Sequence, residues 1–181
     1  MKLNIMPTPE SKTSEIQVVP EDQSYMLIKP DALRDGCAPS IYEMLYESGI
    51  SIEKVYGISL TKEDGEFLYG DDIQNARDSN DPVMEDYRVR GAHILEGECL
   101  ILQLSMLGHS KEETDEVLRK LKGVAYRTEY TIRGRLCFPL PEKTNPKFPT
   151  REVENRAHFP RDEQEEAVLR ELMRKHNFIF S

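Results

Sequence analysis

The chain has 181 residues, with 33 acidic and 24 basic side chains and a net charge of −9, which suits one well-buried domain. This charge argues against binding to nucleic acid through general basicity, because a phosphate backbone requires a positive footprint. Three scattered cysteines without a close metal-ligand pair are typical of free thiols in a reducing cytoplasm, and not of a disulfide framework or a zinc site. We therefore expect a cytoplasmic protein without a disulfide framework.

The first 23 residues are expected to be a flexible or loosely docked extension. They contain no continuous apolar core, so they match neither a signal peptide nor a membrane span. No later stretch approaches the length of a transmembrane helix, and we expect no membrane partner.

Residues 24–29 predict a first strand, because the apolar run from Tyr25 to Ile28 leads directly into Lys29 and Pro30. A lysine at this place has two interpretations. It is either a charged residue that faces water where the strand stops, or a cation held rigidly by the following proline to meet an anion.

Hydrophobic periodicity and helix-end signals predict the other elements. In chain order they are a helix over 38–48, a strand over 50–60, a short helix over 61–68, an irregular polar stretch over 70–91, a strand over 99–107, a helix over 110–123, a strand over 131–140 and a helix over 162–175. Helices that alternate with strands able to pair antiparallel favour an α+β fold. We predict a ferredoxin-like βαββαβ sandwich with a four-stranded antiparallel sheet and flanking helices.

Six short motifs follow one another along the chain. They are IKPDA at 28–32, LRDG at 33–36, L-T-x-E-D-x-x-x-L-Y at 60–69, LRKLKG at 118–123, TIRG at 131–134 and ENRAH at 154–158. In this order they resemble the nucleoside diphosphate kinase family, and independent motifs seldom fall in register by chance. The resemblance implies a kinase-like domain over 24–181, with a proline-rich insert at about 139–153.

The resemblance implies an enzyme, a nucleoside-diphosphate kinase that works by a ping-pong mechanism. A histidine takes the terminal phosphoryl group of ATP and passes it to another nucleoside diphosphate. The substrates would be nucleoside di- and triphosphates, with Mg²⁺ held mainly by their phosphates and not by a protein metal site. The family also implies a homo-oligomer built from dimers.

Carried over residue by residue, the resemblance makes His158 the nucleophile. Lys29 and Asn155 would bind the sugar 3′-hydroxyl, and Arg119 and Arg133 would clamp the phosphates. These residue types suit the chemistry, since imidazole is nucleophilic near neutral pH and fixed cations stabilise a migrating phosphoryl group. An arginine also offers a planar fork to two phosphate oxygens.

Two further roles follow from the resemblance. Tyr69 would lie near the histidine and the transferring group. A glutamate of the last helix would hold the other ring nitrogen of the histidine; Glu171 is the favoured match, while Glu165 and Glu166 remain alternatives.

Each of these residues also has an ordinary structural interpretation when taken alone. A loop histidine is commonly a solvated surface residue, and Arg119 lies where a base balances the dipole at a helix end. The joint pattern, and not any single residue, favours the enzyme. His93, His109 and His176 lack matching neighbours, so we interpret them as structural.

The chain departs from the family at several places. Phe159, Pro160 and Arg161 follow the histidine, where the family usually has a small residue and then Ser-Asp. The family's aromatic platform for the base has only a weak candidate, Tyr87. The alternative function is therefore a nucleotide-binding, kinase-like module without catalytic activity, serving a regulatory or scaffolding role.

Overall fold

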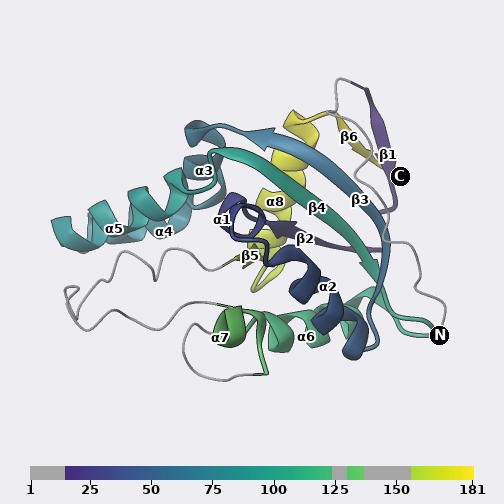
Figure 1. Cartoon of the computed structure of the whole chain (residues 1–181). Helices are drawn as coiled ribbons and strands as arrows, with labels where there is room; N and C mark the ends of the chain where they lie inside the picture. The colour runs from purple at the N-terminus through teal and green to yellow at the C-terminus, as the bar shows by residue number, and fades with distance from the viewer. Residues whose placement is uncertain (1–14, 124–129, 137–155) are drawn as a thin grey trace.

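The computed structural model describes residues 15–123, 130–136 and 156–181 (Figure 1). Its strands are β1 (Gln17–Val19), β2 (Ser24–Ile28), β3 (Ser51–Leu60), β4 (Gly97–Ser105), β5 (Ala157–His158) and β6 (Phe178–Phe180). Its helices are α1 (Pro30–Arg34), α2 (Ala38–Glu47), α3 (Lys62–Leu68), α4 (Gly70–Asp78), α5 (Pro82–His93), α6 (Lys111–Lys122), α7 (Ile132–Leu136) and α8 (Glu163–Lys175). Within these ranges, no helix combines the length and the hydropathy that crossing a bilayer needs.

A four-stranded sheet with the order β3-β4-β2-β5 forms the centre of the molecule, and all its strand pairs are antiparallel. This confirms the predicted α+β fold. All five residues of β2 are buried, which explains why this strand reads as a continuous apolar run and not as an alternating one.

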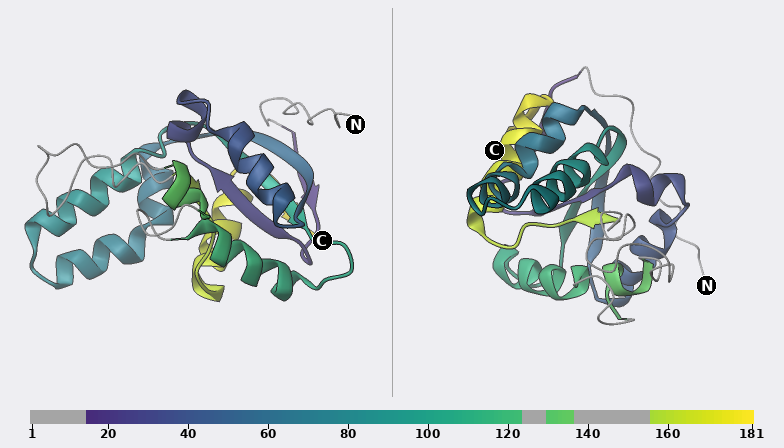
Figure 2. Two further views of the ribbon diagram at one scale, coloured as in Figure 1. Left: turned by 60° about the horizontal axis from the view of Figure 1, so that its bottom comes forward. Right: turned by 90° about the vertical axis from the view of Figure 1, so that its left-hand side faces the viewer.

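The two faces of the sheet carry separate hydrophobic cores. Met26 and Ile28 of β2 point into the core formed with α2, α6 and α7. Tyr25 and Leu27 alternate with them and point into the core formed with α3, α8 and β6. The sheet therefore lies between two helical layers (Figure 2).

The fourth strand is not where the sequence predicts it. Of the predicted strand over 131–140, residues Ile132–Leu136 form the helix α7, and 137–140 lie outside the described residues. The free edge of β2 is instead taken by β5, so the helical segment has another role. It buries Ile132 in the core beside α6.

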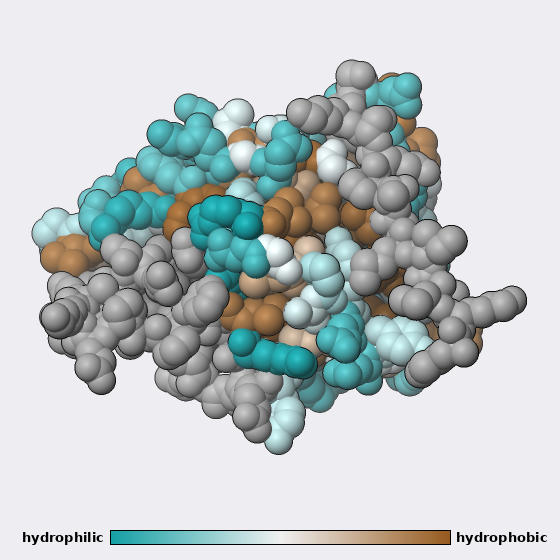
Figure 3. Space-filling model, viewed as in Figure 1, coloured by the Kyte–Doolittle hydropathy of each residue, from teal (hydrophilic) through white to brown (hydrophobic). Residues whose placement is uncertain are grey.

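The polar stretch over 70–91 is helical and not irregular as predicted. It forms α4 and α5, which project away from the sheet (Figures 1 and 2). Hydrophilic residues cover much of this part of the molecule on the face seen in Figure 3, although α5 also exposes Val83, whose exposed fraction is 50%. Asp81 caps α5 and Pro82 occupies its first turn, a helix-start signal present in the sequence.

The described part of the N-terminal extension, residues 15–23, is docked on the domain. Its strand β1 pairs in parallel with the C-terminal strand β6, and Val19 is fully buried. The hydroxyl of Tyr25 also donates a hydrogen bond to the carbonyl of Pro20 at 2.6 Å. Residues 1–14 and the insert at 139–153 lie outside the described residues.

Candidate functional site

His158 lies on the two-residue strand β5, where it pairs with Leu27 of β2. Only 4% of its surface is exposed. Its ring meets that of Tyr69 edge-on, with centroids 5.5 Å apart and an interplanar angle of 89°. The Tyr69 hydroxyl lies 3.4 Å from Nδ1 of the histidine. A surface-loop interpretation of His158 therefore does not apply.

Tyr69 is positioned by helix α3, which ends at this residue. A capping box holds the beginning of α3, because the side chains and backbone amides of Thr61 and Asp64 bond reciprocally. Close packing holds its middle, where Gly65 lies against the backbone of Ala92 in α5. The place of the tyrosine is thus fixed by local sequence signals and one tertiary contact.

Lys29 follows β2 and precedes α1, whose first residue is Pro30. Its exposed fraction is only 1%, so the lysine does not face water at the strand end. Its Nζ lies 5.0 Å from the centroid of the Tyr69 ring, within the range of a cation–π contact. The structure thus brings together Lys29, Tyr69 and His158, three of the residues that the sequence singles out.

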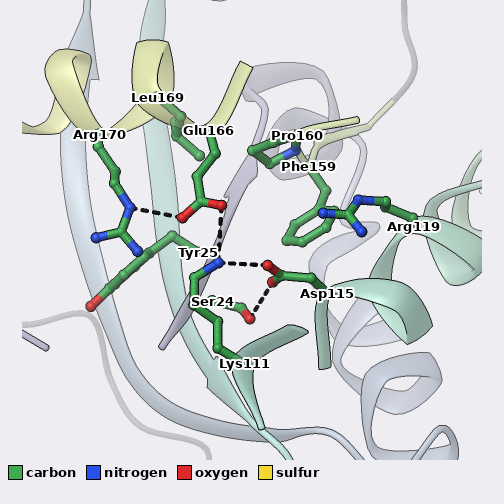
Figure 4. A pocket seen from close by; sticks show the side chains of 10 residues that line it. All are labelled: Ser24, Tyr25, Lys111, Asp115, Arg119, Phe159, Pro160, Glu166, Leu169 and Arg170. Atoms are coloured by element: carbon green, nitrogen blue, oxygen red, sulfur yellow. Dashed lines mark hydrogen bonds and ion pairs between the residues drawn. The ribbon is translucent and has the colours of Figure 1, made fainter. Parts of the chain in front are cut away.

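The other predicted nucleotide-binding residues are not all part of this group. Arg119 is an exposed residue of α6 and lines a small pocket beside Phe159 and Pro160 (Figure 4). Arg133 belongs to α7, and Asn155 lies outside the described residues.

The three candidate glutamates for orienting the histidine are engaged by cations. Glu171, whose side chain is 52% exposed, contacts Arg174 at 3.2 Å, and Glu165 binds Arg161. Glu166 accepts hydrogen bonds from Lys111 at 2.9 Å and from Arg170 at 2.8 Å (Figure 4). Burial raises the pKa of Glu166, but these two bonds outweigh it and lower the pKa overall. Each of the three carboxylates is thus paired with at least one cation.

Two buried cations next to the histidine are missed by the sequence analysis. Arg156 is fully buried, and Lys122 is 7% exposed. Arg156 lies inside the ENRAH motif, but nothing in the motif indicates that its guanidinium is buried. Lys122 ends α6, where a base is ordinarily explained by the helix dipole.

A hollow of about 560 Å³ opens between α3, α4 and the beginning of α8, and Tyr69 is one of the residues that line it. Asp71, Asp72, Asp162 and Glu165 line it together with one cation, Arg161. Arg161 spans it to Asp72 at 3.5 Å. This surplus of carboxylates disfavours a polyphosphate in the hollow, whereas the ammonium of Lys29, which does not line it, attracts one.

Metal-ligating residues do not cluster in the part of the chain that the structure describes, since it holds no group of three or more His, Cys, Asp or Glu side chains suited to an ion.

Comparison with known proteins identifies the fold. No protein-family model and no curated protein sequence matches the chain. Solved structures of nucleoside diphosphate kinases do match. The enzyme from Borrelia burgdorferi, described as a transition-state mimic with bound vanadate and ADP, is 16% identical, with 83% of this chain and 84% of that chain covered and a TM-score of 0.61.

Two further kinases agree. The enzyme from Encephalitozoon cuniculi is 17% identical over 83% of this chain and 87% of its own, with a TM-score of 0.56. The enzyme from Aquifex aeolicus is 14% identical over 84% of this chain and 94% of its own, with a TM-score of 0.57. At these identities the likeness establishes the fold: the chain has the ferredoxin-like architecture of nucleoside diphosphate kinases.

Proposed function

We propose that this protein is a nucleoside-diphosphate kinase that transfers the terminal phosphoryl group of a nucleoside triphosphate to a nucleoside diphosphate through a phosphohistidine. The observation that carries the proposal is the group formed by Lys29, Tyr69 and His158. These residues come from three separate elements and meet in a chain with the fold of such kinases.

The nucleophilic atom in this proposal is Nδ1 of His158. Nε2 is buried, whereas Nδ1 faces the hydroxyl of Tyr69. Nδ1 attacks the terminal phosphorus, a P–N bond forms, and the bond from phosphorus to the bridging oxygen breaks to release the diphosphate. In the second half-reaction an oxygen of the acceptor diphosphate takes the phosphoryl group and restores the free imidazole.

Lys29 and Tyr69 have electrostatic roles. The buried ammonium of Lys29 offsets the negative charge of the transferring group in a site where little water competes. The Tyr69 hydroxyl donates a hydrogen bond to a phosphoryl oxygen once Nδ1 carries the group. Mg²⁺ enters as part of the nucleotide substrate, where it neutralises phosphate charge.

The proposal includes the wider biology implied by this activity. The partners are nucleoside di- and triphosphates, and neither a nucleic acid nor a membrane is among them. We also propose a homo-oligomer built from dimers and a cytoplasmic location, where nucleotides are abundant and thiols stay reduced.

Incubation with γ-labelled ATP tests the proposal. The protein should acquire a phosphoryl group that is stable in base and labile in acid, and should pass it to added diphosphate. His158→Ala should abolish labelling while nucleotide binding survives. His109→Ala is the matched control, because His109 is half exposed and its ring pairs with Glu113 at 3.3 Å. Normal labelling of His158→Ala would show that the nucleophile is another residue.

A nucleotide-binding module without catalysis is the second candidate function. Two placements favour it. Arg119 lines a small pocket that Lys29, Tyr69 and His158 do not line, and the three candidate glutamates are paired with cations. Such a module would bind nucleotide in a titration and stay unlabelled. Labelling of the wild-type chain that depends on His158 would exclude it.

A further inference from the structure

We propose that Arg156 and Lys122 are positioning residues, two buried cations that hold His158 in place from its two sides along the chain. The inference deepens the proposed function, and its kinetic test rests on that function. Neither cation is assigned to contact the nucleotide. Each acts through the backbone that carries the histidine.

The strand that carries His158 is too short to hold its own position. Strand β5 has two residues, and its ladder to β2 consists of the pairs Ala157–Ile28 and His158–Leu27. Short edge strands gain little from backbone pairing alone. The position of His158 therefore depends on what holds the residues next to it.

Arg156 holds the chain before the histidine. Its Nη1 donates to the carbonyl of Asp31 at 3.0 Å and to the carboxylate of Asp35 at 2.7 Å, and its Nε donates to the carbonyl of Leu136 at 3.0 Å. One planar guanidinium thus joins β5 to both α1 and α7. A lysine ammonium cannot match this set, because its donors radiate from a single atom.

The backbone of Arg156 is part of the same connection. Its amide donates to the carboxylate of Asp31 at 3.2 Å, and its carbonyl accepts from the amide of Lys29 at 2.9 Å. Arg156 therefore couples the histidine strand to the residue that carries the buried ammonium of the site. Its φ of 65° lies in the left-handed region, which residues other than glycine rarely adopt unless their contacts enforce it.

Lys122 holds the chain after the histidine. Its Nζ donates to the carbonyl of Phe159 at 2.6 Å, although Lys122 is the last residue of α6 and lies 37 positions earlier in the chain. Phe159 is itself 3% exposed and packs in the core with α6. The residues immediately before the strand and immediately after the histidine are thus both fixed by side-chain hydrogen bonds from buried cations.

A buried cation is by itself weak evidence for a stabilising role. Removing a charge from water is costly, and buried ion pairs can often be replaced by apolar residues without loss of stability. If the cations only stabilised the fold, replacing them would lower the free energy of unfolding and leave the reactivity of the folded protein unchanged. A positioning role predicts instead that the chain stays folded but the histidine reacts slowly. Displacement of a reacting group by about 1 Å can cost on the order of a hundredfold in rate.

The test compares two variants with two matched controls. Arg156→Lys replaces the several donors of the guanidinium by a single ammonium. Lys122→Met removes the ammonium that donates to Phe159. Arg174→Lys and Lys120→Met make the same changes at exposed positions, where the side chains pair with Glu171 and Glu116. We expect the rate of His158 phosphorylation to fall at least about tenfold in the first pair, with KM for ATP within about threefold, and to be unchanged in the controls.

A nucleotide-independent measurement separates this inference from the proposed function. The imidazole resonances of His158, followed by NMR against pH, should shift in Arg156→Lys and Lys122→Met and stay at wild-type positions in both controls. If the wild-type chain takes no label, the proposed function fails and this measurement alone decides the positioning role. Wild-type His158 resonances in both folded variants would overturn it.

A milder substitution covers the case in which Arg156→Lys fails to fold. Asp35→Asn removes the nearer of the two carboxylates that pair with Nη1, and Asp31 stays at 3.5 Å. The bonds from Arg156 to the carbonyls of Asp31 and Leu136 also remain. We expect a smaller displacement of the His158 resonances in the same direction. Unchanged resonances in Asp35→Asn, together with unchanged ones in Lys122→Met, would also overturn the inference.

Discussion

The Tyr69 hydroxyl and Nδ1 of His158 lie 3.4 Å apart although 89 positions separate the two residues in the chain. The contact depends on two unrelated packing arrangements. Helix α3 carries the tyrosine to the sheet edge, and the pairing of β5 with β2 brings the histidine to meet it. The candidate site is therefore sensitive to anything that moves α3 or β5.

Tyr69→Phe tests the hydroxyl. The edge-on contact between the rings should survive, while the donor beside Nδ1 is lost. We expect His158 phosphorylation to slow on the order of a hundredfold, as loss of one hydrogen-bond donor to a transition state does. Rapid-quench measurement of label uptake gives this rate. Tyr46→Phe, at an 80% exposed position, serves as the control, and equal rates in the two variants would argue against a role for the Tyr69 hydroxyl.

Lys29→Met separates function from stability. The ammonium is almost fully buried, so replacing it by an apolar chain of similar length removes a desolvation cost. We expect the free energy of unfolding in urea to stay the same or rise by about 1 kcal/mol, while phosphoryl transfer falls on the order of a hundredfold.

The control for this substitution is Lys62→Met, because Lys62 is half exposed and pairs with Glu96 at 3.7 Å. It should change neither quantity. A marked loss of stability in Lys29→Met with normal transfer would instead assign the lysine to the core.

Gly65→Ala should destabilise the protein through the contact between α3 and α5. A Cβ at this position would lie 2.1 Å from the carbonyl oxygen of Ala92, so the two helices must separate. We expect a loss of about 1–3 kcal/mol in urea unfolding, as overpacking causes. Because α3 ends at Tyr69, phosphorylation of His158 should slow as well.

Gly57→Ala is the comparison for Gly65→Ala. A Cβ at Gly57 meets nothing within 4 Å. Its stability should stay within about 0.5 kcal/mol of the wild type. Equal losses in the two variants would mean that the close approach of Gly65 to α5 is not the cause.

The free energy of unfolding should depend on pH in the acidic range through the carboxyl group of Asp35. Hydrogen bonds from Arg34 and then from Arg156 lower the pKa of this carboxyl from 3.8 to about 2. A lowered pKa in the folded state stabilises the protein while the carboxylate is ionised, so the contribution is fully present above the unfolded value. It is lost as the pH falls through 3.8 toward about 2.

Urea midpoints measured across this range would check the assignment. The wild type should exceed Asp35→Asn in stability at about pH 5 and lose most of this difference near the lowered pKa. A difference that stayed constant down to acid pH would show that the carboxylate charge is not what stabilises the fold.

Local sequence signals determined most of the elements. The capping boxes at Thr61 and Ser110 are formed as the sequence indicates, because a cap requires only residues three positions apart. The apolar run after Ser24 forms one of the two inner strands of the sheet, where burial on both faces leaves no polar alternation. The sequence also singled out Lys29, Tyr69 and His158, because short motifs carry them.

Tertiary structure alone decided the fourth strand. Residues 131–136 have an apolar pattern compatible with a strand, but β5 takes the edge of β2 and the segment becomes α7. The two residues of β5 have no periodicity to detect. Whether a segment becomes an edge strand depends on whether the rest of the fold places it beside the free edge of the sheet. A local sequence pattern does not contain this information.

The burial of charge was likewise decided only by the fold. Arg156 and Lys122 look like ordinary surface cations in the sequence, yet both are buried beside the histidine. A charged side chain is buried only where distant groups supply its hydrogen bonds, here the carbonyls of Asp31, Leu136 and Phe159. The sequence by itself singled out the candidate residues for the proposed chemistry. The tertiary structure decided what holds them, because those partners lie far apart along the chain.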